Sequence, residues 1–401
     1  MQRNALFVSI TGFFVVVFLG FSAVAFAGNE ADQAFKWPAL FRIATPATQS
    51  ASFASANGWG PMLQAETGMD VRVVPEDSEI RRYIRFALKK EFELVSTSIA
   101  EVGLSIQGDS GYAIQEAVHQ RAVWHHNDTP WSFAVRGDSK YKTIYDLKQK
   151  GVRVALSSQS PPMMLAVQEA LPAFLGWTKE EAAANWTFVP VGSYPENCRT
   201  ITDGKADVSY MTPISSITYE MEAHPQKIRW LGMPADNIEG WDGYLKVRPT
   251  IIPNKIDFGV PSAIGVDAMT SPFIFWTRPD VDQEMVYHLT KWFHERFEQY
   301  KGVHAINARM SMAHTRTFLD RSAFPIAEGT IRYLREIGQW TEADDHWNQA
   351  QIDLMERWIA ARNAAFKEAK SKKIKLHWEN KEYLDILKKH TEGLPVFKTR
   401  L

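Results

Sequence analysis

Phe41-Arg-Ile-Ala-Thr-Pro-Ala-Thr-Gln-Ser50 is echoed farther along the chain by Val152-Arg-Val-Ala-Leu-Ser-Ser-Gln-Ser160. Each stretch is a short apolar strand that leads into a loop of Ser, Thr and Gln. After each loop the sequence again follows one pattern: a helix, a second strand, another helix and a third strand. Internal repeats fix an architecture before any local motif does, so this echo predicts two similar lobes, each built on a parallel sheet.

The alternation of strands and helices is clearest in the first copy. Strands are predicted over 41–43, 69–75 and 92–95, with helices over 53–66 and 79–90 between them. Such alternation is typical of parallel strands joined by right-handed crossovers. The predicted fold class is therefore α/β: a two-lobed, periplasmic-binding-protein-like fold of type II, in which a mostly parallel sheet flanked by helices forms each lobe.

Two further apolar runs, Trp131–Val135 and Pro272–Trp276, are predicted to be the crossover strands that join the lobes as a hinge. The charged, helix-patterned segment at the C-terminal end is expected to pack one apolar face on the body as a structural appendage. The predicted division is a signal peptide over 1–27, lobe I over 28–130 and 275–340, lobe II over 131–274, and a helical C-terminal extension over 341–401.

Residues 1–27 have the pattern of a secretory signal peptide. Arg3 gives a positive start, an apolar run follows, and Ala25-Phe-Ala27 offers a small-x-small cleavage site. A retained membrane anchor is the alternative, because the apolar run approaches spanning length. Cys198 is the only cysteine, so no intramolecular disulfide can form. We expect a periplasmic protein with no stable membrane anchor after the signal is removed.

Charge and motifs give no indication of nucleic-acid binding or catalysis. The net charge is −1 and 23% of the residues are charged, so a basic patch for nucleic acid is not expected. The sequence has no Gly-rich phosphate loop and no nucleophile elbow. His125-His126 near Asp128 is interpreted as a surface loop rather than a metal site, because adjacent strand residues point to opposite faces. We expect a protein that is not an enzyme and has no cofactor or metal.

Candidate ligand-binding residues follow from the predicted sheets. Ligands of open parallel sheets bind beyond the carboxyl ends of the strands, where helix N-termini favour anions. Hydroxyl and amide groups there can hold an anion, although ordinary helix caps and turns are the alternative interpretation. The candidates are Thr45, Thr48, Gln49, Ser50, Ser78, Ser96, Thr97 and Ser98 in lobe I, Trp131 at the crossover, and Ser157, Ser158, Gln159, Ser160, Ser193, Tyr194, Tyr210 and Thr212 in lobe II.

Several segments resemble, in their order and spacing, the TAXI family of solute-binding proteins, which serve tripartite ATP-independent periplasmic (TRAP) transporters. The chain departs from that family at three loops. The family's first loop usually has glycines around Ser and Thr, where this chain has Ala44-Thr-Pro-Ala-Thr-Gln-Ser50. A Gly-Gly-Ser loop is replaced by Asp77-Ser-Glu79, and a Gly-Ser-Gly-Thr loop by Ser160-Pro-Pro-Met163. The resemblance covers about residues 40–340, and it is carried by Phe41–Thr45, Asp146–Val154, Glu196–Asp207, Met285–Lys291 and Pro325–Gly338.

The resemblance implies a periplasmic receptor without a cofactor. It would capture a small organic anion, a dicarboxylate or an amino-acid-like molecule, by closing its lobes and would deliver it to a TRAP-type membrane permease. Three alternatives remain open: a ligand sensor that regulates a membrane signalling partner, a receptor for an ATP-driven importer, and an exported enzyme on a similar fold.

Overall fold

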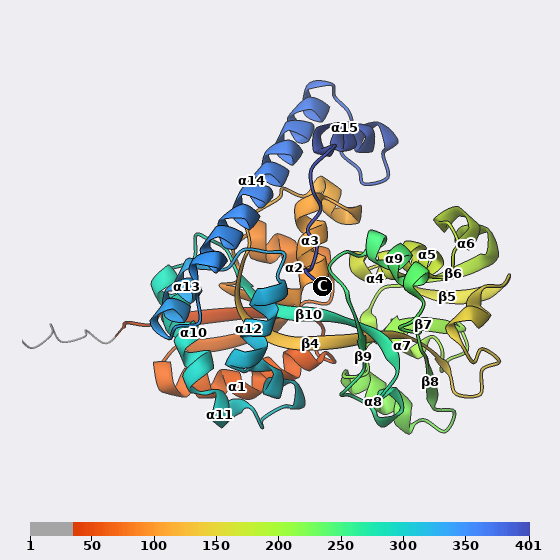
Figure 1. The fold of residues 1–401 in the computed structure, drawn as a ribbon, viewed down its shortest axis with the longest axis horizontal. Coiled ribbons are helices and arrows are strands. Elements are labelled where there is room, and N and C mark those ends of the chain that lie inside the picture. The colour runs from red at the N-terminus through yellow and green to blue at the C-terminus, as the bar shows by residue number, and fades with distance from the viewer. Residues whose placement is uncertain (1–34) are drawn as a thin grey trace, which may run out of the picture. The chain divides into compact units, whose positions relative to one another are not determined.

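The computed structural model describes residues 35–401, so the predicted signal peptide lies outside the described residues. Within them, a ten-stranded arrangement runs in the order β2-β1-β3-β10-β4-β7-β5-β6, with β8 beside β4 and β9 beside β10 (Figure 1). The strands are β1 (Leu40–Thr45), β2 (Asp70–Pro75), β3 (Leu94–Ser98), β4 (Arg121–Arg136), β5 (Val152–Ser157), β6 (Trp186–Val191), β7 (Val208–Met211), β8 (Ile228–Leu231), β9 (Ile252–Lys255) and β10 (Asp267–Thr277).

Helices flank these strands on both sides (Figure 1). Single π-helical turns over 84–88 and 166–170 continue α2 and α4. The α-helices are α1 (Ala51–Thr67), α2 (Glu79–Tyr83), α3 (Ile99–Gln107), α4 (Pro161–Leu165), α5 (Leu171–Phe174), α6 (Lys179–Asn185), α7 (Tyr194–Arg199), α8 (Ser216–Ala223), α9 (Ile238–Val247), α10 (Gln283–Glu295), α11 (Phe297–Tyr300), α12 (Met312–Arg321), α13 (Glu328–Glu336), α14 (Glu342–Ser371) and α15 (Lys381–Thr391).

Strand β4 is shared between two sheets. From Arg121 to Trp131 it pairs antiparallel with β10, and from Ser132 to Arg136 it pairs antiparallel with β7 and β8. In lobe I, β1 lies parallel to β2 and β3; in lobe II, β5 lies parallel to β6 and β7. This mixed α/β architecture, with two helix-flanked sheets joined through long strands, confirms the predicted fold class. The predicted boundaries of the lobes stay a prediction.

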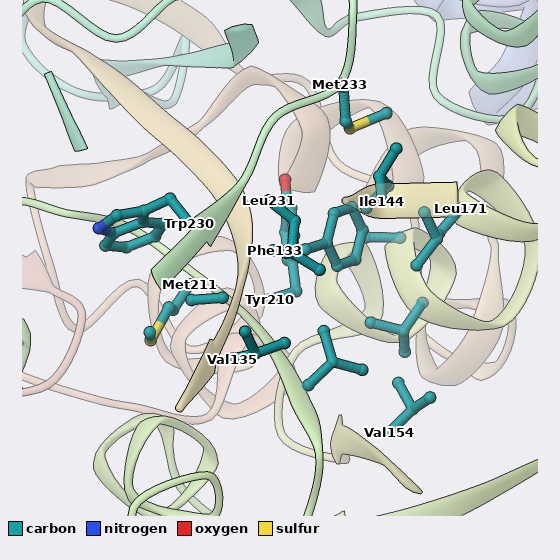
Figure 2. Packing of buried hydrophobic residues seen from close by; sticks show 14 of the residues in the cluster. Phe133, Val135, Ile144, Val154, Leu171, Tyr210, Met211, Trp230, Leu231 and Met233 are labelled. Atoms are coloured by element: carbon teal, nitrogen blue, oxygen red, sulfur yellow. The ribbon is translucent and has the colours of Figure 1, made fainter. Parts of the chain in front are cut away.

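Each sheet has its own hydrophobic core. In lobe I, the ring of Trp59 on α1 packs edge-on against Phe293 of α10, with centroids 5.1 Å apart, and against Phe275 of β10. In lobe II, Phe133 of β4 and Tyr210 of β7 lie among buried aliphatic side chains (Figure 2). Burying apolar area at about 25 cal/mol per Å² is the main term that stabilises each lobe.

The interpretation of His125 and His126 as a surface loop is wrong, because both side chains are buried in β4. They face different neighbours, as adjacent strand residues do. The ring nitrogens of His126 lie 2.9 Å and 2.7 Å from the hydroxyls of Ser55 and Ser96. His125 contacts a backbone carbonyl and, at 3.1 Å, the carboxylate of Asp128. Among residues 35–401 no group of acidic, His or Cys side chains is arranged to hold a metal ion.

The C-terminal extension is attached to lobe I through Arg362 of α14, which is fully buried. Its guanidinium donates hydrogen bonds of 2.5 to 2.6 Å to the carbonyl oxygens of Ser105, Tyr112 and Gln115. Gly108 ends α3 beneath it with a φ of +80°, and a Cβ atom at this position would lie 2.6 Å from the Arg362 Nε. In the described part of the chain, α14 included, no helix has the length and apolar character needed to cross a bilayer.

Replacing this arginine tests how the extension is held. Arg362→Met leaves several buried carbonyl oxygens without hydrogen-bond donors. Each buried acceptor that loses its donor lowers the stability of the folded state. We expect the free energy of unfolding to fall by about 2–4 kcal/mol, measured by urea denaturation. The matched control is Arg357→Met, an exposed position on the same helix, which should change it by less than about 0.5 kcal/mol. Equal effects of the two substitutions would contradict this account.

Candidate functional site

A cavity lies between lobe I and lobe II and is lined by residues of both. It encloses about 610 Å³ of space outside protein atoms, counting the part that opens to solvent. Both apolar and polar residues line it, as is typical of small-molecule sites. The lining residues are Pro46, Ala47, Ser50, Ala51, Ser52, Asp77, Glu79, Arg82 and Thr129 from lobe I, Phe273 of β10, which pairs with β3 of lobe I, and Trp131, Gln159, Ser160, Met163, Tyr194, Thr212, Ile214 and Ser215 from lobe II.

Helix α1 begins at this cavity. The Ser50 hydroxyl accepts a hydrogen bond from the Phe53 N–H at 3.1 Å and so caps the helix. Ala51 and Ser52 form the first turn and line the cavity. First-turn N–H groups have no acceptor within a helix, and the positive end of the helix dipole lies there. This corner is therefore suited to a carboxylate or another acceptor group.

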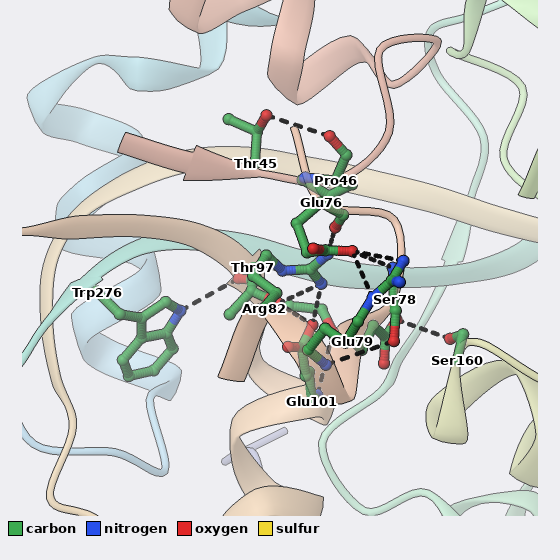
Figure 3. A network of polar contacts seen from close by, with 12 residues as sticks. Thr45, Pro46, Glu76, Ser78, Glu79, Arg82, Thr97, Glu101, Ser160 and Trp276 are labelled. Atoms are coloured by element: carbon green, nitrogen blue, oxygen red, sulfur yellow. Dashed lines mark hydrogen bonds and ion pairs between the residues drawn. The ribbon is translucent and has the colours of Figure 1, made fainter. Parts of the chain in front are cut away.

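Two acidic side chains of lobe I reach across to lobe II. The Asp77 carboxylate accepts a hydrogen bond from the Tyr194 N–H at 3.0 Å, at the start of α7. The Glu79 carboxyl accepts one from the hydroxyl of Ser160, the capping residue of α4, at 2.7 Å (Figure 3). The Glu79 N–H donates to the Gln159 carbonyl at 3.1 Å. Carboxyls of the chain itself thus lie at the loops of lobe II where the sequence predicts contacts to a ligand anion.

Arg82 lies beside Glu79 and is buried (Figure 3). Its guanidinium donates to the Glu101 carboxylate at 2.5 Å and to the Glu76 carbonyl at 2.6 Å. The hydroxyl of Thr97 donates to the same carboxylate of Glu101. The charge of Arg82 is therefore balanced by Glu101, as a buried guanidinium requires.

The electrostatic environment of the cavity is acidic. Burial raises the pKa of Glu79 well above its usual value, and the nearby charge of Glu101 adds to this shift while Arg82 opposes it. Burial also raises the pKa of Asp77, although the hydrogen bond from Tyr194 opposes the change. Among the described residues that line the cavity, Arg82 is the only one with a cationic side chain. No unpaired positive charge is therefore offered to a ligand.

Several polar atoms of lining residues are buried and have no hydrogen-bond partner among the described residues. Native proteins leave few such atoms, because each costs about 1–3 kcal/mol when nothing satisfies it. Four of the thirteen such atoms of the described residues belong to residues that line this cavity, and a molecule bound there is one source of the missing partners. The four atoms are Glu79 Oε2, Arg82 Nε, Gln159 Oε1 and Thr212 Oγ1.

The structure brings only part of the predicted ligand contacts to this cavity: Ser50, Trp131, Gln159, Ser160, Tyr194 and Thr212. Thr48, Gln49 and Ser193 lie at a neighbouring surface pocket. The side chains of Ser78 and Ser98 cap α2 and α3, and Ser158 donates to the Val191 carbonyl. The others are buried outside the lining: Thr45, Ser96, Thr97, Ser157 and Tyr210. Ligand contact stays a prediction for all of these residues.

Sequence reasoning missed Asp77, Glu79 and Arg82 as site residues. Charged residues at the start of a short helix are usually solvated, so their types alone gave no signal. The replacement of a family Gly-Gly-Ser loop by Asp77-Ser-Glu79 was the available signal, since it exchanges a small, neutral loop for two carboxyls. Phe273 and Thr129 were missed because their place in the cavity depends on how β4 and β10 pair.

The raised pKa of Glu79 makes a prediction for the ligand-free protein. The folded state keeps a proton that the unfolded chain releases, so Glu79 lowers stability as pH rises above the ordinary Glu pKa of about 4.3. Glu79→Gln should therefore have a higher Tm than the parent at about pH 8, with a gap that narrows toward about pH 4.

Thermal unfolding monitored by circular dichroism across this pH range measures the effect. Glu180→Gln, at an exposed position of α6, serves as the matched control and should follow the parent curve at every pH. A Glu79→Gln curve that runs parallel to that of the parent would show that Glu79 is ionised in both states and would contradict the assignment.

The fold and site define a two-lobed α/β protein with a small-molecule cavity between its lobes. Residues 43–338 match the NMT1-like family, and because this segment is well over half of the 401 residues, the chain belongs to that family. The finer assignment to the TAXI family stays a prediction. Among curated proteins, none matches the sequence.

Solved structures of solute-binding proteins are similar at low sequence identity. One is a binding-protein component of an ABC phosphonate transporter from Pseudomonas aeruginosa, with a TM-score of 0.44 and 10% identity over 82% of this chain and 99% of that one. PhnD1 from Prochlorococcus marinus, in complex with methylphosphonate, has a TM-score of 0.44 and 11% identity over 76% and 100%. The alkanesulfonate-binding protein SsuA from Xanthomonas axonopodis pv. citri, bound to MOPS, has a TM-score of 0.38 and 14% identity over 85% and 96%.

Proposed function

We propose that the chain is a periplasmic solute receptor, which closes its two lobes on a small organic molecule and presents it to a membrane transporter. The observation that carries this proposal is the cavity between the lobes, with its buried polar atoms that lack partners in the chain. A ligand that satisfies Glu79 and Arg82 from lobe I together with Gln159 and Thr212 from lobe II contacts both lobes at once.

Closure follows from contacts that form only when the lobes approach. Asp77 and Glu79 of lobe I bond to Tyr194 and Ser160 of lobe II, and the Gln49 carbonyl accepts from the Ser216 N–H at 3.1 Å. A ligand that adds further contacts across the same gap favours the closed state by its difference in affinity for the two states. The long strands β4 and β10, which run between the lobes, are the natural hinge.

The cavity favours an amino-acid-like solute over a dicarboxylate. One carboxylate fits the start of α1, where Ala51 and Ser52 present first-turn backbone. A second carboxylate would meet Asp77 and Glu79 with no free cation to balance it, so it would lose its hydration without gaining an ion pair. Apolar walls from Met163, Ile214 and Phe273 suit a hydrocarbon body.

The transporter is proposed to be a TRAP-type permease, which rests on the sequence resemblance described above. Two other partners give different outcomes in the same experiment. Pull-down from detergent-solubilised inner membranes, with the mature chain as bait, should recover a permease without nucleotide-binding subunits. Recovery of an ATP-hydrolysing importer or of a sensor kinase would contradict the TRAP-type permease as partner. Neither result would contradict the capture of a solute.

Solute capture is tested by native mass spectrometry of the chain purified from a periplasmic extract without unfolding. We expect a bound small molecule, which is recovered unchanged and raises the Tm of the stripped protein. Trp131→Ala should weaken its binding by about tenfold to a hundredfold, because an aromatic wall is lost. Tyr219→Ala, at an exposed position of α8, should bind like the parent. Absence of any binding molecule, or its conversion to a product, would contradict the proposal.

A further inference from the structure

We propose that the solute carries a protonated amine, and that the Glu79 carboxyl receives it in a subsite completed by Asp77 and Trp131. This inference rests on the proposed receptor function and names the chemical class of its ligand. A small zwitterion or a small amine with an apolar body would satisfy it; a simple monoanion or dianion would not.

The hydrogen bonds of Glu79 define what is missing at this subsite. One carboxyl oxygen, Oε1, already accepts the hydrogen bond from Ser160 at 2.7 Å. The other, Oε2, is buried and has no partner among the described residues, and Glu79 is one of the residues that line the cavity. Once Glu79 is ionised, this oxygen only accepts hydrogen bonds, so the group that completes the ionised carboxylate is a donor. An ammonium group has three N–H donors and no acceptor, so it can donate a hydrogen bond to the ionised Oε2 of Glu79.

The charges around Glu79 favour the same group. Asp77 adds a second carboxyl to the lining, whereas the single lining cation, Arg82, is held 2.5 Å from Glu101. An incoming anion would therefore lose its hydration without gaining a free positive partner, while an ammonium gains two negative ones. The half-buried ring of Trp131 stacks on Tyr210 with centroids 5.0 Å apart and meets Tyr194 edge-on at 6.3 Å. Indole faces attract cations, which adds to the preference.

Proton balance gives the proposal a distinct signature. Glu79 faces Glu101 of α3, Arg82 of α2, Asp77 of its own loop and Ser160 before α4, and its burial raises its pKa well above the usual value. Tyr112, which also senses the charge of Glu79, remains neutral because burial raises its own pKa. Where Glu79 is protonated before binding, an ammonium ion forms its ion pair only as that carboxyl proton leaves to solvent. Binding therefore releases a proton, and affinity rises with pH until the amine itself deprotonates.

Shape-matched probes separate charge from size. We would titrate the mature chain, stripped of its co-purified solute, with 2-phenylethylamine against 3-phenylpropanoate and with 3-methylbutylamine against 4-methylpentanoate. L-Phenylalanine adds a zwitterion, and methylphosphonate adds a compact anion. Isothermal titration calorimetry should show each amine, or the zwitterion, binding at least about tenfold more tightly than its carboxylate match. Repeating the titration in two buffers of different ionisation enthalpy counts the released protons.

Variants then assign the effect to Glu79. Glu79→Gln keeps the size of the side chain but should weaken amine binding by about tenfold or more and abolish proton release. Asp77→Asn should weaken amine binding by a smaller factor than Glu79→Gln does. Circular dichroism checks that this second variant is folded. Glu180→Gln should bind amines like the parent. Proton release is measured on the parent protein. The proposal can therefore be tested even if a variant fails to fold.

The possible outcomes separate this proposal from the receptor function. Tighter binding of the carboxylates or of methylphosphonate, or a co-purified solute without a basic nitrogen, would overturn the amine class and leave solute capture standing. Amine binding that releases no proton and is unaffected by Glu79→Gln would overturn the role of Glu79. If the stripped chain bound no probe and no molecule from the periplasmic extract, both the amine class and the receptor function would fall.

Discussion

The pairing of β4 with two sheets is the constraint on which the rest of the structure depends. Up to Trp131 its hydrogen bonds go to β10, and from Ser132 onward they go to β7 and β8. Trp131 stands where the partners change, and it lines the cavity together with Thr129 just before it. In the proposed receptor, a solute that rests against this part of β4 contacts the strand that joins the two lobes. The proposed function therefore couples binding and closure through one strand.

The acidic loop of lobe I gives the cavity its character. Asp77 and Glu79 bond to groups at the starts of α7 and α4, so the closed state forms carboxyl contacts of its own across the gap. These contacts take up donors of lobe II that an anionic ligand would otherwise use. Arg82 does not restore the balance, because Glu101 already pairs with it. The chemistry of the site is therefore set by two carboxyls and by the apolar walls around them, which is why we infer a ligand that donates hydrogen bonds.

Local sequence patterns were sufficient to predict the repeated strands, the helix over 53–66 and the polar loops, because apolar periodicity and Ser caps act over a few residues. The same patterns placed Ser50 and Ser160 beside the cavity. They could not predict that Glu79 bonds to Ser160, 81 residues away, or that Arg82 finds Glu101. Those contacts depend on how whole elements pack. The burial of His125 and His126 escaped prediction for a related reason: His126 is satisfied by Ser55 and Ser96, which come from other parts of the fold.

The central claim is that a solute bound between the lobes stabilises their closed arrangement. It is tested most directly by the distance between nitroxide labels on Asn57→Cys in α1 and Lys150→Cys in lobe II, both exposed positions, measured by double electron–electron resonance. The native Cys198 is buried, so it should not compete for the label. The account predicts a broad distribution for the stripped protein that narrows and shifts to shorter distances when the co-purified solute is added. Distance distributions that are the same with and without saturating solute would contradict it.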